Sequence, residues 1–110
     1  ITIVQKIKPL SINKAFQGRR FKTQEYKDYE KMLLYILPKK QMIKGEVSLD
    51  IDFFFKYPKK CDIDNCIKPL LDILVKKGYI EDDRKIMKMD LRKFQSDEEG
   101  FEVRIDLFKS

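Results

Sequence analysis

The sequence predicts an α+β fold: a single domain over residues 1–110, with a mixed sheet in the order β-α-β-α-β-β and two helices packed on it. Two segments repeat apolar residues at the helical period of 3.6, and four shorter ones carry the apolar patterns typical of strands. A chain of 110 residues, 43% of them hydrophobic, has material for one core. We therefore expect one folded unit.

The first forty residues predict one strand and one helix. The isoleucine-rich run 1–7 indicates a strand that ends at Pro9. Thr23 is typical of a helix N-cap, and Pro38 stops the helix that it starts. We expect the apolar stripe of this helix to belong to the core. The stripe consists of Tyr26, Tyr29, Leu33, Ile36 and Leu37.

A second amphipathic helix is predicted between Asp64 and Gly78. Pro69 has no backbone N–H and is tolerated only near a helix start, so we expect the regular helix to begin at Asn65 or Cys66, with Asp64 as its N-cap. Two lysines and Gly78 mark its end. Its apolar stripe consists of Ile67, Leu70, Leu71, Leu74 and Val75.

Three further strands are predicted around this helix. Residues 47–55 alternate between two sets of side chains and lead directly into an acidic segment. Residues 87–92 and 101–107 alternate in the same way. The short polar segment 96–100 between them favours a hairpin that joins these last two strands.

The positive charge is unevenly distributed along the chain. The net charge is +6, but residues 1–40 hold ten Lys and Arg against three acids, whereas residues 61–110 hold ten against twelve. A basic front half indicates a polyanionic partner, because lysine and arginine gain affinity for phosphate backbones by releasing counterions. The alternative is a basic face that serves only solubility.

We expect two basic segments to contact DNA. Residues 11–22 interleave basic and aromatic side chains, which is typical of segments that bind phosphates and stack on bases. A pair of lysines also stands immediately before the acidic segment. The expected contacts are Asn13, Lys14, Arg19, Arg20, Lys22, Lys59 and Lys60.

Aspartates gather in the second half of the chain. Asp62 and Asp64 are two residues apart, so an extended segment would point both to one side, and Asp82 and Asp83 follow later. Two carboxylates about 4 Å apart repel by on the order of 4 kcal/mol at an effective dielectric near 20, which a divalent ion would offset. Oxygen ligands favour Mg²⁺, with Mn²⁺ as a substitute. The alternative is that Asp64 caps a helix and the later pair only solvates a turn.

Lys68 stands one helical turn after Asp64 and one turn before Asp72. One interpretation is that Lys68 only forms a surface ion pair. The other is that Lys68 is a fixed cation beside the metal, able to contact a phosphate or to stabilise the negative charge that builds up on it. A basic part that holds a polyanion and an acidic part that holds a metal are together what a nuclease needs.

Other classes of protein are disfavoured by composition. The sequence contains no histidine, which excludes His-based triads and general acid–base catalysis from this chain. Cys61 and Cys66 lack CxxC spacing, so free thiols are expected rather than a zinc site. No apolar run approaches the roughly 20 residues of a membrane span. We expect a cytoplasmic protein that acts without membrane or small-molecule cofactor.

The chain resembles the RusA family of Holliday junction resolvases from about Lys8 to Phe108. The family's Asp-x-Asp-Asn-x-x-Lys signature is similar to the segment from Asp62 to Lys68, and its later acidic pair to the segment 81–84. The early loop 11–22 followed by Tyr26 is also similar to the family's N-terminal pattern.

The resemblance implies a fold, an activity and a set of site residues. It implies a homodimeric, magnesium-dependent endonuclease, often encoded by phages and prophages in bacterial cells, that cuts four-way DNA junctions. An alternative is a non-catalytic protein of a phage or prophage that only binds branched DNA. For the enzyme, the resemblance implies metal ligands at Asp62, Asp64 and Asp83, and catalytic roles for Asp62, Asp64, Lys68 and Asp83.

Overall fold

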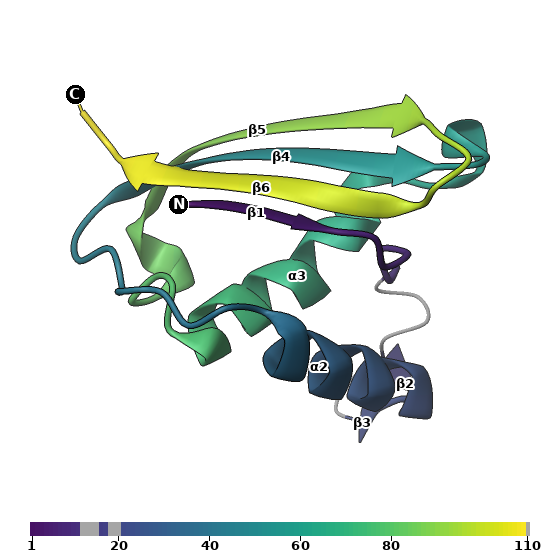
Figure 1. Cartoon of the computed structure of the whole chain (residues 1–110), viewed down its shortest axis with the longest axis horizontal. Helices are drawn as coiled ribbons and strands as arrows, with labels where there is room; N and C mark the ends of the chain where they lie inside the picture. Colours follow the sequence, from purple (N-terminus) through teal and green to yellow (C-terminus); the bar gives the residue numbers. More distant parts are fainter. Residues whose placement is uncertain (12–15, 18–20, 110) are drawn as a thin grey trace.

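The computed structural model describes residues 1–11, 16–17 and 21–109 (Figure 1). It confirms the α+β class. A mixed four-stranded sheet carries two helices, and a separate two-stranded ribbon lies within the predicted basic loop. Two short 3₁₀ helices, η1 and η2, flank the second helix. In chain order the elements are β1 (Thr2–Gln5), β2 (Phe16–Gln17), β3 (Phe21–Lys22), α2 (Gln24–Ile36), β4 (Val47–Phe55), η1 (Pro58–Lys60), α3 (Ile63–Lys77), η2 (Asp83–Lys85), β5 (Ile86–Gln95) and β6 (Gly100–Leu107).

The sheet has the strand order β1-β6-β4-β5, with β4 parallel to β5 and antiparallel to β6. The predicted hairpin between the last two strands is therefore wrong, because β4 lies between them (Figure 1). The physical reason is burial. Every second residue of β4 from Val47 to Phe55 is buried, so this strand takes a central position, whereas β5 is largely exposed and takes an edge.

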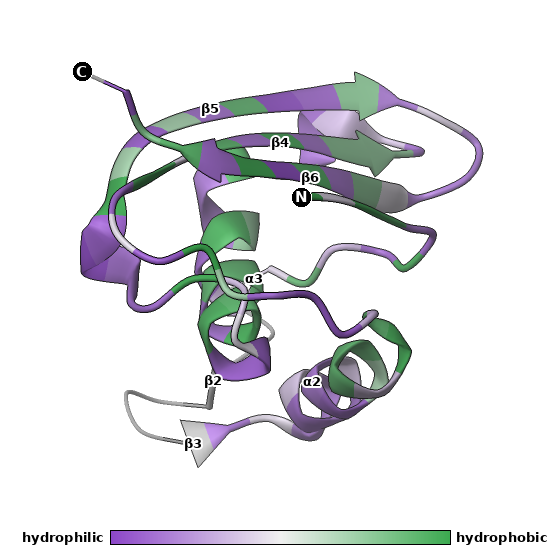
Figure 2. Ribbon diagram, turned by 60° about the vertical axis from the view of Figure 1, so that its left-hand side comes forward, coloured by the Kyte–Doolittle hydropathy of each residue, from purple (hydrophilic) through white to green (hydrophobic). Residues whose placement is uncertain are grey.

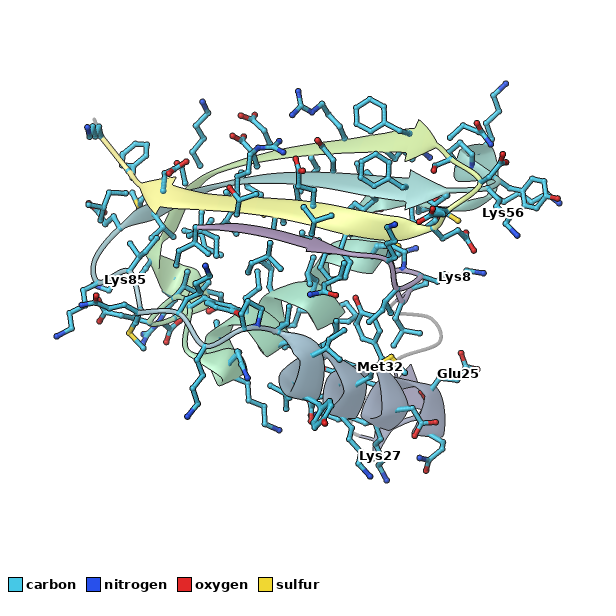
Figure 3. All side chains as sticks on the ribbon, in the orientation of Figure 1. Lys8, Glu25, Lys27, Met32, Lys56 and Lys85 are labelled. Carbon is cyan, nitrogen blue, oxygen red and sulfur yellow. The ribbon has the colours of Figure 1, made fainter. Side chains whose placement is uncertain are left out.

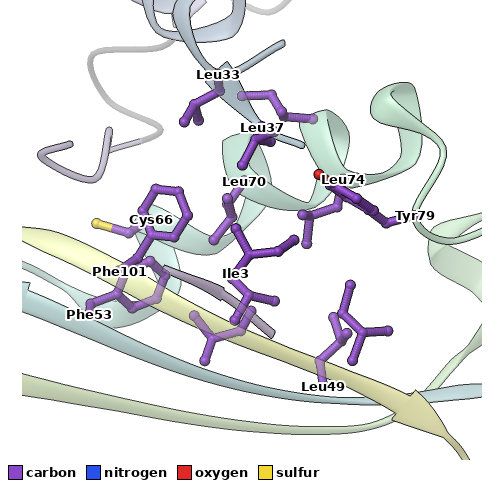
Figure 4. Packing of buried hydrophobic residues seen from close by; sticks show 14 of the residues in the cluster. Ile3, Leu33, Leu37, Leu49, Phe53, Cys66, Leu70, Leu74, Tyr79 and Phe101 are labelled. Carbon is purple, nitrogen blue, oxygen red and sulfur yellow. The ribbon is translucent and has the colours of Figure 1, made fainter. Parts of the chain in front are cut away.

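Both helices lie on one side of the sheet (Figure 1). The core fills the space between the two layers, and Figure 4 shows side chains from strands and helices meeting there. Phe53 of β4 faces Phe101 of β6 at a paired position, and both are fully buried. Bands of hydrophobic and hydrophilic residues alternate along β5, as expected for a strand with one covered face (Figure 2).

The first helix forms as predicted. The hydroxyl of Thr23 accepts a hydrogen bond from the backbone N–H of Tyr26 and caps the start of α2. Most of the predicted stripe is buried, but Ile36 is exposed. Two contacts hold α2 to α3: the Lys76 ammonium lies 2.9 Å from a carboxylate oxygen of Glu30, and Lys77 donates to the carbonyl of Leu34 at 2.8 Å.

The start of α3 differs from the prediction. The helix begins at Ile63 with Asp62 as its N-cap, so Asp64 lies inside the first turn instead of capping it. Pro69 is consequently an interior residue, in a helix that continues to Lys77 and ends at Gly78 with a φ of 89°. Proline removes only the hydrogen bond to the carbonyl four residues earlier, which here belongs to the first turn, and its ring is buried in the core.

The outer face of the sheet is not covered by any described helix. Its one buried charged residue is Asp52, which is 9% exposed and is held by Arg92 at 2.9 Å and Arg104 at 3.4 Å. Next to this network the rings of Phe54 and Phe94 stack with their centroids 5.7 Å apart. The outer face therefore combines paired charges with a stacked aromatic pair, in which Phe54 is half-buried and Phe94 is exposed.

Within the described ranges, no helix is both long and apolar enough to span a bilayer.

Candidate active site

A pocket of about 490 Å³ opens at the N-terminal end of α3. Asp62 and Asn65 border it from the start of the helix, and Phe55 and Tyr57 border it from the end of β4 and the following connection. The segment between β1 and α2 contributes residues 8–11. The family signature therefore lies beside a concave surface formed by several separate parts of the chain.

Asp62 and Asp64 share the open end of α3 in a geometry that differs from the predicted one. The sequence predicted an extended segment with both carboxylates on one side, whereas Asp62 is the N-cap and Asp64 is a first-turn residue. Helix residues two apart do not face each other, and of the two acids Asp62 borders the pocket while Asp64 is exposed in the first turn. The positive end of the helix dipole favours carboxylates there and equally favours a phosphate.

Asn65 of the signature forms two hydrogen bonds with Asp62. Its side-chain amide donates a hydrogen bond to a carboxylate oxygen of Asp62 at 3.3 Å, and its backbone N–H donates to the Asp62 carbonyl at 3.2 Å. Two contacts across one turn restrict the orientation of Asp62. The signature thus contains a residue that positions one of its own acids.

Lys68 lies one turn further along α3. Its ammonium is 3.1 Å from a carboxylate oxygen of Asp72, and half of its side chain remains exposed. An exposed ion pair between positions i and i+4 contributes a few tenths of a kcal/mol. The ion pair with Asp72 therefore orients the Lys68 side chain but leaves its ammonium group accessible to a phosphate.

The three acids of the later acidic segment, residues 81–83, make different contacts. Glu81 accepts a hydrogen bond from the backbone N–H of Gly45 and so holds a loop. Asp82 caps η2 by accepting from the backbone N–H of Arg84 at 2.9 Å, and the hydrogen bonds from Arg84 lower the pKa of Asp82 to about 2. Asp83 is exposed and borders a second pocket of about 370 Å³ together with Leu71. The three acids of this segment therefore differ in their contacts, and Asp83 is the one beside the flank of α3.

The two pockets lie apart. Leu71 is eight residues into α3, which places the Asp83 pocket about 12 Å along the helix from its start. Figure 3 shows Lys85 of η2 at the opposite end of the molecule from Lys8 and Lys56. Among the described residues, no three Asp, Glu, Cys or His side chains are grouped so as to hold a metal ion. The three-carboxylate metal site thus stays a prediction, with two of its members at the α3 start.

Three of the predicted DNA contacts can be located. Lys59 and Lys60 are exposed in η1, directly before Asp62. Lys22 is already engaged by Glu30 at 3.1 Å, and its ammonium also lies 4.7 Å from the centroid of the Tyr26 ring. The other four, Asn13, Lys14, Arg19 and Arg20, lie outside the described residues.

The structure adds Tyr57, which sequence reasoning did not assign to the site. This tyrosine is 66% exposed, and the Lys60 ammonium lies 5.2 Å from its ring centroid. Both residues border the pocket beside Asp62. A signal was available: the run Tyr57-Pro58-Lys59-Lys60 combines an aromatic with basic residues, as does the segment 11–22.

Both cysteines are free and also border this pocket. Cys66 is buried in α3, and burial, followed by the nearby Cys61 and Asp62, raises the pKa of its thiol to about 11. A thiol that stays protonated at neutral pH is a poor nucleophile. Cys66 is therefore a packing residue behind the site.

Comparison with known proteins identifies the family to which the chain belongs. A family model described as Endodeoxyribonuclease RusA matches residues 7–106. The chain is also 30% identical over 99 residues to a protein of Aquifex aeolicus (strain VF5) named Crossover junction endodeoxyribonuclease RusA, and the match covers 84% of this chain and 77% of that protein. The family match includes residues 62–68 at the α3 start. The chain belongs to the RusA family of endodeoxyribonucleases.

Proposed function

We propose that this chain is a magnesium-dependent endonuclease that resolves four-way DNA junctions by paired hydrolysis of phosphodiester bonds, in recombination or repair. The observation that carries the proposal is the start of α3, where Asp62 and Asp64 share the positive end of a helix beside a pocket. Membership of a nuclease family supports the reaction class. The substrate is inferred from the relative's name, Crossover junction endodeoxyribonuclease RusA. For a protein that acts on DNA junctions of a bacterial host, we propose the cytoplasm as its location.

The donor atoms at the α3 start suit a magnesium ion that the protein holds only in part. Magnesium is commonly bound by one or two carboxylates and takes its remaining ligands from water and substrate phosphates. Asp62 and Asp64 supply such carboxylates, and Asn65 restrains the first of them. When bound, the ion lowers the pKa of a water molecule and offsets phosphate charge. Mn²⁺ accepts the same oxygen donors and is expected to substitute.

Lys68 is proposed to stabilise the negative charge that develops on the phosphate. It projects from the same helix one turn beyond Asp64, and its half-exposed ammonium is held by Asp72. A fixed cation requires little reorganisation when charge builds up in the transition state. Lysine here acts as a point charge and does not need to transfer a proton.

Asp83 is proposed as the third acid of the site. Glu81 and Asp82 accept hydrogen bonds from backbone N–H groups of local structure, and Asp83 is exposed beside them. Its pocket on the flank of α3 is separate from the one beside Asp62. Replacing Asp83 by Asn tests this assignment. If Asp83 is a third ligand, the variant should need a higher Mg²⁺ concentration to cut DNA, and if it has no role, cutting should equal that of the wild type.

The DNA backbone is proposed to follow the exposed lysines around the pocket. Lys59 and Lys60 stand on one side of Asp62, and Lys8 and Lys56 lie at the same end of the molecule (Figure 3). Lysines in this arrangement neutralise phosphates on both sides of the scissile bond. The basic residues of segment 11–22, which follow Lys8 in the chain, are proposed to extend this path.

A homodimer is proposed because a four-way junction needs two cuts. One chain carries one Asp62 and Asp64 pair, so two copies related by a two-fold axis would supply two sites. The stacked Phe54 and Phe94 on the uncovered face of the sheet are proposed to contribute to the contact, because burying exposed aromatic rings favours association.

Incubation with labelled DNA tests the proposal. The protein is mixed with a four-way junction, a flap and a plain duplex, each with and without Mg²⁺. We expect paired cuts in the junction, only with the metal, and little cutting of the duplex. Binding of the junction without cutting under any metal condition would instead favour the non-catalytic branched-DNA-binding protein.

A further inference from the structure

We infer that Tyr57 is a specificity-determining residue that stacks against an unpaired base beside the scissile phosphate. The inference rests on the proposed function, and it concerns whether the DNA base beside Asp62 is stacked in the duplex or unstacked. Duplex DNA keeps its bases stacked inside the helix, whereas bases at a branch point can leave the stack. A site that binds an unstacked base favourably would prefer branched DNA to duplex DNA.

The position of Tyr57 is the first argument. The ring is 66% exposed although it follows Phe55, which is fully buried at the end of β4. It borders the pocket to which Asp62 also belongs, five residues further along the chain. An exposed aromatic side chain at the edge of a concave site is available to a ligand and contributes little to the core.

The surroundings of the ring are the second argument. The Lys60 ammonium lies 5.2 Å from the ring centroid and so occupies one face of the tyrosine. The exposure of the side chain leaves the other face for a partner. A base stacked there would have the tyrosine ring between it and Lys60, and Lys60 could neutralise the phosphate of the same nucleotide. Proteins that bind single-stranded nucleic acid use this combination of stacking and charge.

The third argument is that the connection carrying Tyr57 is held in place. Pro58 fixes the backbone at the start of η1. From the neighbouring strand β5, the Lys93 ammonium donates hydrogen bonds to the carbonyls of Pro58 and Cys61, both at 2.7 Å. The stacking surface is therefore formed before DNA arrives, which lowers the entropy cost of binding.

The pocket also has the size and lining for a base. Its volume of about 490 Å³ falls within the range of pockets that take small organic ligands. Pro9, Leu10 and Phe55 supply apolar lining, and Asn65 supplies a polar edge. A planar heterocycle with polar edges is matched by such a mixed surface.

A binding cycle without catalysis tests the inference. Affinity is measured without divalent metal for the wild type, Tyr57→Ala and Tyr57→Phe, on a four-way junction and on a copy whose branch-point nucleotides are abasic. Stacking of one base on an aromatic ring predicts that Tyr57→Ala loses about 5- to 150-fold in affinity on the intact junction. The loss should vanish on the abasic junction, and Tyr57→Phe should bind like the wild type because it keeps the ring.

Tyr35→Ala is the matched control, because Tyr35 is an 88% exposed tyrosine on α2. It should bind both junctions like the wild type. Equal losses on intact and abasic DNA, no loss in Tyr57→Ala, or a loss in Tyr57→Phe as large as in Tyr57→Ala would each overturn the inference. Cutting of the intact junction by the wild type with Mg²⁺ is scored separately, so a failure of the proposed nuclease function is recognised independently.

Discussion

The side-chain amide of Asn65 holds the carboxylate of Asp62 across the first turn of α3, at 3.3 Å. This contact gives the asparagine directly after Asp64 a role in orienting the Asp62 carboxylate. Asp62 is an N-cap residue without a capping hydrogen bond from its own side chain, so its carboxylate would otherwise be free to rotate. The amide restricts it and leaves further carboxylate lone pairs for a cation.

Removing one of the two acids at the helix start should separate binding from cutting. We expect Asp64→Asn to lose detectable junction cleavage, because it removes a metal ligand, while junction affinity stays equal or rises, because it also removes repulsion toward phosphates. Gel-shift and cleavage assays on one protein preparation measure both. Asp106→Asn changes an exposed acid on β6 and should retain activity. Magnesium-dependent cutting by Asp64→Asn would remove this residue from the site.

The basic segment before α2 should be visible in the salt dependence of binding. If Lys14, Arg19 and Arg20 each neutralise one phosphate, replacing all three by Ala should flatten the log–log salt slope by about 2.7 per chain, at about 0.9 per contact. Adding Lys22→Ala should change the slope little more, because Glu30 already engages this lysine. A variant with Lys44, Lys85 and Lys109 replaced loses the same charge from exposed positions. Equal slopes in the two triple variants would contradict a DNA contact in this segment.

Gly100 should not tolerate a side chain. A Cβ atom at this position would lie 2.3 Å from the backbone carbonyl oxygen of Gln5 in β1, where backbone atoms cannot move aside easily. We expect Gly100→Ala to lower the free energy of unfolding by about 1–3 kcal/mol, as overpacking does elsewhere. Urea denaturation measures the loss. Asp106→Ala, at an exposed position of the same strand, should change stability by less than about 0.5 kcal/mol, and a similar effect of both substitutions would refute the close approach.

Burial of Cys66 should make stability fall in alkali. Because the folded protein raises the pKa of this thiol from 9.0 to about 11, folding favours its protonated form. The corresponding stabilisation is fully present below pH 9 and is lost as the pH rises from 9 to 11. Burial also raises the pKa of Tyr26 and of Tyr29, so the informative quantity is the difference between wild type and Cys66→Ala. The Cys66→Ala variant should lose less stability than the wild type over this pH interval. Parallel curves for Cys66→Ala and wild type would contradict the shift.

The oligomeric state decides the paired-incision mechanism. Light scattering at micromolar concentration should give about twice the chain mass of 13.2 kDa. Phe94→Glu should reduce the mass toward that of one chain, because it places a charge beside Phe54 on the outer face. Tyr35→Glu makes the same change at an exposed position on α2 and should leave the mass unchanged. A wild-type mass near 13.2 kDa, with or without junction DNA, would rule out the mechanism.

Side-chain periodicity predicted the helices and strands well but did not predict which strands pair with each other in the sheet. The patterns around Tyr26 and over 47–55 found a helix and a strand whose buried residues are the expected ones, because side-chain spacing is a local property. The pairing of β5 is a non-local property. A short polar connection between two alternating segments fits a hairpin equally well, and only the burial of β4 shows that this strand separates them.

The site was predictable as a list of residues and less so as an arrangement. Asp62 and Asp64 are both good N-cap residues, and the sequence alone favoured the second because Pro69 suggested a late start. The distance of Asp83 from them depends on the path of the chain after α3, for which no local pattern exists. Tyr57 was missed because the run 57–60 is predicted to contact DNA through its lysines alone, and the pocket beside the tyrosine is a property of the fold.

The strand order also has a consequence for how the chain folds. β6, the final strand of the sheet to leave the ribosome, is the one that joins β1 to β4, with Thr2 opposite Arg104 and Ile51 opposite Val103. Until then β1 has no neighbour in the sheet and one edge of β4 is open. Contacts this distant in sequence slow folding and prolong the exposure of strand edges. We therefore expect nascent chains cut short before β6 to aggregate, and the sheet to close in one late step.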